Sequence, residues 1–263
     1  MERIGLVEGE VIGLCAAKSA PLPKKSKVSG MKRWTAPLLA ALALCAVQAW
    51  AAVSPPNLHE TFSTSSPANW LIGGTGGGGT VDTGNSRMVL TNTGGHESGY
   101  AIYNQAFDSS LGVSVTFDYY SGGGSGADGI SFFLLDGAVV TPYSGDNGAA
   151  LGYTYYLGGS ADHPNPTNGV PSAYVGIGFD EYGNFSTQTA TGSADTNAPG
   201  FSPQHVVLRG SGSGMSGYGY LAGYDVSGLG GVDGGWRRVN IYIEAGHHVD
   251  FRTFPTLFWG LTA

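Results

Sequence analysis

The sequence predicts an all-β protein built as an antiparallel β-sandwich, in which two sheets pack face to face. Short runs rich in aromatic and aliphatic residues recur at regular spacing and are bounded by Gly, Pro, Asn and Asp. After Ala52 no 3.6-residue repeat is sustained, which argues against amphipathic helices. Glycine supplies 45 of the 263 residues, as expected of a chain with many tight turns. These observations favour two packed β-sheets.

The first four expected strands occupy 99–107, 112–120, 129–137 and 173–180. The run at 129–137, "GISFFLLDG", is too apolar to be exposed. The run at 173–180, "AYVGIGFD", is apolar and punctuated by glycine, and it ends abruptly in Asp180. Upstream of these strands, the stretch "IGGTGGGGT" at 72–80 is interpreted as a long, flexible hairpin loop.

The remaining expected strands occupy 205–210, 218–223, 237–245 and 256–263. In 237–245, Val239, Ile241 and Ile243 alternate with Asn240 and Tyr242, so the apolar residues share one face. This alternation predicts a strand with one face buried and the other face in solvent.

The amino-terminal region has the pattern of a secretory signal peptide at residues 31–51. Met31-Lys32-Arg33 is basic, residues 36–47 form an apolar stretch too short to span a bilayer, and Ala49-Trp50-Ala51 forms an A-x-A cleavage signal. Residues 1–30 are interpreted as an extension from a start codon placed too early, and 52–263 as the β-sandwich domain. The expected localisation is secreted, periplasmic or at the cell surface.

Composition after the expected cleavage point limits the possible partners. Cys15 and Cys45 both precede the cleavage point, so no disulfide is expected in the mature chain. With Glu2, Glu8 and Glu10 set aside, five arginines face sixteen acidic residues, a net charge of −11. So acidic a surface argues against nucleic acid and membranes as partners. Arg209, Arg237 and Arg238 are interpreted as charges at strand edges.

Two short motifs carry the residues best suited to bind a ligand. Asp180, Tyr182 and Asn184 are alternate residues, so their oxygens can converge, and Ca²⁺ prefers such hard oxygen donors. Asp128 stands just before an apolar strand, where a carboxylate must be held by hydrogen bonds or a ligand. Taken alone, each motif also fits a polar turn, because Asp-Gly and D-x-x-x-N are common turn patterns.

Taken together and in this order, the motifs resemble those of the legume-type (L-type) lectins, and in particular the L-type lectin-like domains of secreted bacterial proteins. The resemblance runs from about Leu58 to the C-terminus. It rests on "GADGISFFLLDG" (126–137), "LGY" (151–153), "GIGFDEYGN" (176–184) and "HVVLRG" (205–210). It implies a concanavalin-like (jelly-roll) β-sandwich. "TLFWGLTA" (256–263) resembles the start of that family's final core strands, which leaves open whether the C-terminus is complete.

The resemblance implies a sugar site formed by three residues from three segments. In this family an aspartate that follows a cis peptide bond and an asparagine from the calcium loop bind sugar hydroxyls, together with one backbone N–H. These positions correspond here to Asp128, Asn184 and the N–H of Ala149, with Gly148 as the alternative donor. An aromatic side chain is expected to cover the C–H face of the sugar, with Tyr143, Tyr153 and Tyr182 as candidates.

The resemblance also implies a single Ca²⁺ ion and argues against a second metal. The implied calcium ligands are Asp180, the carbonyl of Tyr182 and Asn184, with Asp195 the one candidate for the family's second aspartate and Glu181 available if the chain bends. The family's transition-metal glutamate corresponds to Gly178, and His205 stands at its histidine position. With the glutamate lost, no transition-metal site is expected.

The leading functional hypothesis is a secreted, Ca²⁺-dependent carbohydrate-binding domain without catalytic activity, with a glycan or polysaccharide as partner and a role in surface adhesion. One alternative is a structural surface module that has lost its sugar site. A less favoured alternative is a glycan hydrolase or lyase. Such enzymes need paired carboxylates, and on this fold they present E-x-D-x-x-E or E-x-D-x-E runs that this sequence lacks. Which sugar is bound, and the oligomeric state, do not follow from the sequence.

Overall fold

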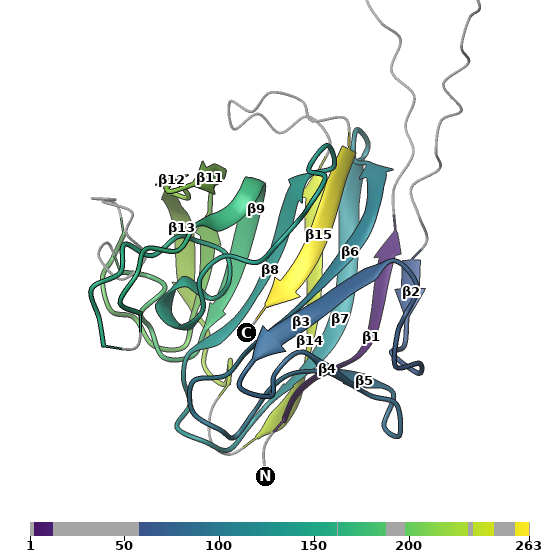
Figure 1. Cartoon of the computed structure of the whole chain (residues 1–263), viewed down its shortest axis with the longest axis horizontal. Coiled ribbons are helices and arrows are strands. Elements are labelled where there is room, and N and C mark those ends of the chain that lie inside the picture. The colour runs from purple at the N-terminus through teal and green to yellow at the C-terminus, as the bar shows by residue number, and fades with distance from the viewer. Residues whose placement is uncertain are drawn as a thin grey trace, which may run out of the picture.

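The protein is described from a computed structural model, and the described residues are 58–161, 163–187, 198–230 and 234–244, with the backbone of strands at 3–12 and 256–262. Two antiparallel sheets pack against each other (Figure 1). The prediction of an all-β antiparallel sandwich is therefore confirmed. Within the described residues, the helical content is a single 3-10 turn, η1 (Gly148–Ala150). None of the described segments forms a helix long and apolar enough to cross a membrane.

The six-stranded sheet includes a strand from the extreme amino terminus. Its order is β14 (Gly235–Glu244), β7 (Gly112–Ser121), β1 (Arg3–Ile12), β5 (Arg87–Asn92) and β4 (Thr80–Asp82), with β2 (Leu58–Glu60) also paired to β1. Strand β1 comes from the segment interpreted from sequence as a start extension. The domain boundaries and the signal peptide stay predictions, because residues 31–51 lie outside the described residues.

The nine-stranded sheet carries the segments in which the ligand motifs lie. Its order is β12 (Ser216–Gly217), β11 (Gly212–Gly214), β9 (Gly169–Asp180), β8 (Gly129–Asp136), β15 (Thr256–Thr262), β6 (Ser98–Asp108) and β3 (Trp70–Thr75), with β10 (His205–Arg209) joining β9 to β13 (Tyr220–Asp225). The loop predicted at 72–80 is wrong in part, because β3 runs to Thr75. Glycine is required at position 74, since an ideal Cβ there would lie 2.1 Å from the backbone carbonyl oxygen of Ser98 on β6.

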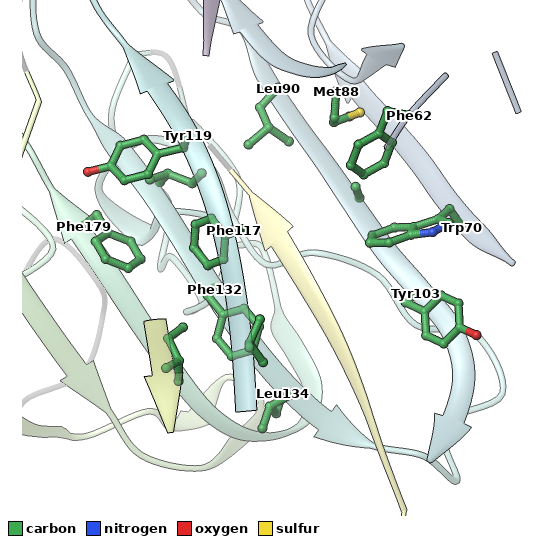
Figure 2. Packing of buried hydrophobic residues seen from close by; sticks show 14 of the residues in the cluster. Phe62, Trp70, Met88, Leu90, Tyr103, Phe117, Tyr119, Phe132, Leu134 and Phe179 are labelled. Carbon is green, nitrogen blue, oxygen red and sulfur yellow. The ribbon is translucent and has the colours of Figure 1, made fainter. Parts of the chain in front are cut away.

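The main hydrophobic core lies between the two sheets (Figure 2). Phe117 and Tyr119 of β7 pack there with Phe132 of β8 and Phe179 of β9. The alternation predicted in β14 is confirmed, because Ile241 is buried whereas its neighbours Asn240 and Tyr242 are exposed. The period-two pattern therefore identifies the face of β14 that the sandwich buries.

A second core covers the opposite face of the nine-stranded sheet. Phe133 and Leu135 of β8 point into it, and long loops contribute Leu151, Tyr153 and Phe185. Strand β8 is consequently buried on both faces, which explains why its sequence is apolar without alternation. The loops that close this second core also carry Gly148 and Asn184.

Candidate functional site

The site is assembled where three neighbouring strands begin or end. Gly129 at the start of β8 and His205 at the start of β10 are both paired with Asp180 at the end of β9. Because antiparallel neighbours place the start of one strand beside the end of the next, Asp128 and the loop after Asp180 meet at one edge. The N–H of Tyr182 donates to the carbonyl of Asp128 at 3.0 Å, which closes this edge.

Asp128 and Asn184 contact each other directly. Nδ2 of Asn184 donates to Oδ1 of Asp128 at 2.7 Å. Oδ1 of Asn184 is buried and has no hydrogen-bond partner among the described residues. The peptide bond between Ala127 and Asp128 is cis, as the resemblance implies. Gly129 follows with a φ of 146°, and an ideal Cβ there would lie 2.3 Å from the carbonyl oxygen of Phe179, so a side chain is excluded.

The η1 turn approaches the same carboxylate from a separate loop. Gly148 has a φ of 60°, and an ideal Cβ on it would lie 3.6 Å from Oδ2 of Asp128. The turn is fixed by hydrogen bonds from the N–H of Leu151 to the carbonyl of Gly148 at 2.9 Å and from the N–H of Ala150 to the carbonyl of Asn147 at 3.3 Å. The N–H of Ala149 is not used in a hydrogen bond within the described part of the chain. The structure therefore places Asp128 in contact with Asn184 and close to Gly148, the residue before Ala149.

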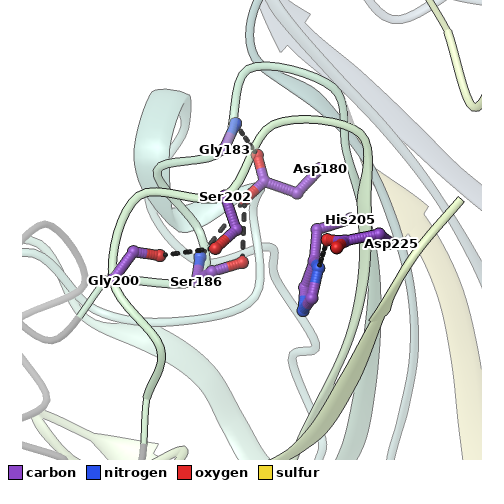
Figure 3. A network of polar contacts seen from close by, with 7 residues as sticks. All are labelled: Asp180, Gly183, Ser186, Gly200, Ser202, His205 and Asp225. Carbon is purple, nitrogen blue, oxygen red and sulfur yellow. Dashed lines mark hydrogen bonds and ion pairs between the residues drawn. The ribbon is translucent and has the colours of Figure 1, made fainter. Parts of the chain in front are cut away.

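Asp180 is the buried carboxylate of the site (Figure 3). Its Oδ1 accepts the N–H of Gly183 at 2.7 Å, and its Oδ2 accepts the N–H of Ser186 at 3.2 Å. Burial raises the pKa of Asp180 to about 6, opposed by backbone hydrogen bonds and reinforced by the negative charge of Asp128. A cation placed against Asp180 would offset this loss of hydration.

The residues of the loop fit a calcium ion with few protein ligands. Asp180 supplies a desolvated carboxylate and Asn184 an unpartnered amide oxygen. Tyr182, which lies between them in the sequence, supplies the predicted backbone carbonyl. These are the hard oxygen donors that Ca²⁺ takes. No three His, Cys, Asp or Glu side chains gather as a metal cluster in the part of the chain that the structure describes. Besides Asp180, a bound ion would therefore rely on neutral oxygens and water. Asp195, the further predicted ligand, lies outside the described residues.

Glu181 faces away from this loop. It is buried, and one of its carboxylate oxygens accepts a hydrogen bond from the hydroxyl of Ser121. It lines a cavity of about 280 Å³ together with Ser125 and other residues of the glycine-rich loop before Asp128. Because the carboxylate of Glu181 is bonded to Ser121 beside this cavity, Glu181 is not a candidate calcium ligand.

The position expected to carry a transition-metal glutamate is closed by an aromatic ring. An ideal Cβ at Gly178 would lie 2.4 Å from the fully buried ring of Phe185, so no longer side chain fits there. Nδ1 of His205 lies 2.7 Å from Oδ1 of Asp225, and its buried Nε2 has no hydrogen-bond partner among the described residues (Figure 3). His205 is thus paired with Asp180 across the sheet, but position 178 offers no carboxylate to complete a transition-metal site.

Arg209 differs from its sequence-based interpretation. The prediction of a strand-edge charge is wrong for this residue, because Arg209 is 0% exposed and β10 is paired on both sides. Its guanidinium donates to the carbonyls of Phe185, Thr187 and Tyr218 and lies 4.9 Å from the centre of the Phe185 ring. It therefore fixes the chain immediately after Asn184. Hydrogen bonds to three carbonyls provide the partners that a buried cation needs.

The three aromatic residues predicted to cover the sugar differ in their exposure to solvent. Tyr153 is wrong as a sugar-covering residue, because it is 0% exposed and its hydroxyl donates to the carbonyl of Gly210 at 2.8 Å. Tyr143 and Tyr182 remain candidates, at 41% and 47% exposed. Tyr182 also meets Phe201 edge to face, with ring centroids 5.3 Å apart. Phe201 is 59% exposed, so the two rings form an accessible aromatic edge, and Tyr182 stands two residues before Asn184 in the sequence.

Comparison with known proteins yields no relative. No family model, no curated protein and no solved structure matches the chain.

Sequence reasoning missed His163, whose ring lies close to Gly148, and its partner Asp146. His163 lies in the loop after η1, and its Nδ1 is 3.2 Å from Oδ2 of Asp146. Neither residue belongs to a motif, and only the folding of two loops onto one another places them at the site. A histidine and an aspartate seventeen positions apart in irregular chain give no periodic signal that could have identified them.

Proposed function

We propose that the protein is a Ca²⁺-dependent carbohydrate-binding domain that acts without catalysis. The observation that carries this proposal is that the two ends of the Asn184 amide face different partners. Its Nδ2 donates to Asp128, while its Oδ1 is buried and unpartnered, next in the chain to the Asp180–Gly183 turn. One amide thus connects a carboxylate suited to sugar hydroxyls with a pocket of oxygens suited to a cation.

The chemistry of each partner follows from the donors and acceptors present. Oδ2 of Asp128 is an acceptor for a sugar hydroxyl, and the N–H of Ala149 is a donor for another. Asp180, Tyr182 and Asn184 would hold the calcium ion, which supplies positive charge that fixes the orientation of Asn184 and balances the buried carboxylate. The exposed edge formed by Tyr182 and Phe201 offers an apolar surface for the C–H face of a sugar ring.

The test is a glycan array probed with the purified full-length chain, once in millimolar Ca²⁺ and once after removal of Ca²⁺ by chelation. We expect binding to at least one glycan only in the presence of Ca²⁺. Asp128→Asn should lose this binding. Asp136→Asn at the other end of β8 removes an equal charge and should not.

The other candidate functions predict different outcomes. A structural surface module of the same fold would bind no glycan in either condition and would show no change in melting temperature with Ca²⁺. Release of reducing ends from a bound polysaccharide would instead identify a hydrolase, and a new unsaturated end would identify a lyase. The oligomeric state is to be measured separately by light scattering, and localisation at the cell surface by fractionation.

A further inference from the structure

Two contacts hold the imidazole of His163 in place, and a third fixes its backbone. Nδ1 lies 3.2 Å from Oδ2 of Asp146, the backbone N–H donates to Oγ of Ser160 at 3.0 Å, and the ring meets Tyr156 edge to face at 5.6 Å. Asp146 is itself buried. A histidine in an irregular loop keeps one orientation only when such contacts fix it, so the direction of its second nitrogen is defined.

That second nitrogen is directed at the predicted sugar site. An ideal Cβ at Gly148 would lie 3.8 Å from Nε2 of His163 and 3.6 Å from Oδ2 of Asp128. The two atoms therefore border the same space, which is open because residue 148 is glycine. Among the described residues neither atom has a hydrogen-bond partner, so both remain available to a ligand.

We propose that His163 is a further sugar-contacting and specificity-determining residue, whose Nε2 hydrogen-bonds a hydroxyl adjacent to the one held by Asp128. Asp146 is a positioning residue that sets the ring through Nδ1. This inference rests on the proposed function and narrows its ligand class. The carboxylates of Asp128 and Asp146 flank the imidazole, so an anionic substituent at this edge meets like charges. The site is therefore selective for uncharged hexoses with neighbouring free hydroxyls and against uronic acids.

The test is titration calorimetry at neutral pH in saturating Ca²⁺, with glucose, mannose, galactose, glucuronate and galacturonate as probes. Wild type should bind at least one hexose, and should bind the uronate of that hexose at least tenfold more weakly. His163→Ala should lower the hexose affinity about threefold to tenfold, which corresponds to the loss of one neutral hydrogen bond. His163→Gln should recover part of this loss.

The controls separate a contact from a structural role. His59→Ala, at an exposed position of β2, should bind as wild type does. Asp146→Asn keeps an acceptor for Nδ1 but removes one flanking charge, so it should bring hexose and uronate affinities closer together. In every variant the melting temperature and the Ca²⁺ midpoint should match wild type, since none of these residues is a calcium ligand.

Three outcomes would overturn the proposal. If His163→Ala binds hexose like wild type while Asp128→Asn does not, His163 makes no contact, although the protein binds sugar. If His163→Ala loses Ca²⁺ stabilisation or thermal stability along with hexose binding, its role is structural. If wild type binds none of the sugars on the array or in solution, the proposed function fails and this inference fails with it.

Discussion

The buried carboxylate of Asp180 should make calcium binding depend on pH. Its pKa is raised by burial from 3.8 to about 6. Because the folded pKa lies above the unfolded value, ionised Asp180 opposes folding. This penalty is absent below about pH 4, grows as the pH rises from about 4 to 6, and is complete above that range. A shift of this size corresponds to about 3 kcal/mol.

Calcium binding should therefore compete with protonation of Asp180. With a pKa of about 6, roughly nine tenths of the carboxylate is ionised at pH 7 and roughly one tenth at pH 5. We therefore expect the apparent dissociation constant for Ca²⁺ to be about tenfold higher at pH 5 than at pH 7. Each ion bound at pH 5 should also release close to one proton.

The assay is a Ca²⁺ titration followed by thermal unfolding at pH 5 and pH 7, after the protein has been stripped of calcium on a chelating resin. Asp180→Asn should abolish Ca²⁺ stabilisation at both pH values. Asp108→Asn, which removes a carboxylate at the distant end of β6, should retain it. Equal calcium affinity at pH 5 and pH 7, or stabilisation of Asp180→Asn to the extent seen in wild type, would refute the reasoning.

Three further predictions follow from the buried contacts around the site. Asp128→Asn should weaken glycan binding at least about tenfold in calorimetry, because hydrogen bonds to a charged group contribute about 1.5–3 kcal/mol, and the variant should still be stabilised by Ca²⁺. Arg209→Met should lower the free energy of unfolding in urea by about 3 kcal/mol or more, since buried carbonyls lose their donors, whereas Arg238→Met at the exposed edge should change it by less than about 1 kcal/mol. Phe185→Ala should cost about 3–5 kcal/mol and weaken Ca²⁺ binding, whereas Phe201→Ala should leave stability nearly unchanged and reduce glycan affinity. An Arg209 variant as stable as wild type, or a Phe185 variant with wild-type unfolding, would contradict the packing described here.

The fold could be predicted where one strand carries its own pattern. The alternation in β14 and the uninterrupted apolar run of β8 each follow from the faces those strands bury. Strand β3 was missed because its glycine at position 74 is required by the close backbone of β6 at Ser98, a contact that local sequence does not encode. Strand β1 was missed because its pairing with β7 and β5 depends on segments far along the chain.

The site was predictable to the extent that its residues lie in ordered motifs. Asp128 and Asn184 could be named because the resemblance attaches roles to their motifs, and the structure places their side chains in contact. Arg209 was misread because charge alone suggests exposure, whereas its environment is set by carbonyls of a loop more than twenty residues upstream. His163 gave no signal, since its importance depends on the meeting of two irregular loops.

The position of strand β1 in the six-stranded sheet conflicts with the predicted signal peptide. In the pairing order, β1 joins the β14–β7 half to the β5–β4 half. Its residues, Arg3–Ile12, lie on the amino-terminal side of the predicted cleavage point after Ala51. Translation from Met31, or cleavage after Ala51, would leave the exported chain without β1, and β7 and β5 would each have a row of unpaired N–H and C=O groups. The exported protein would then need another strand between them, and that vacant position would be a template on which a strand from a second polypeptide could assemble.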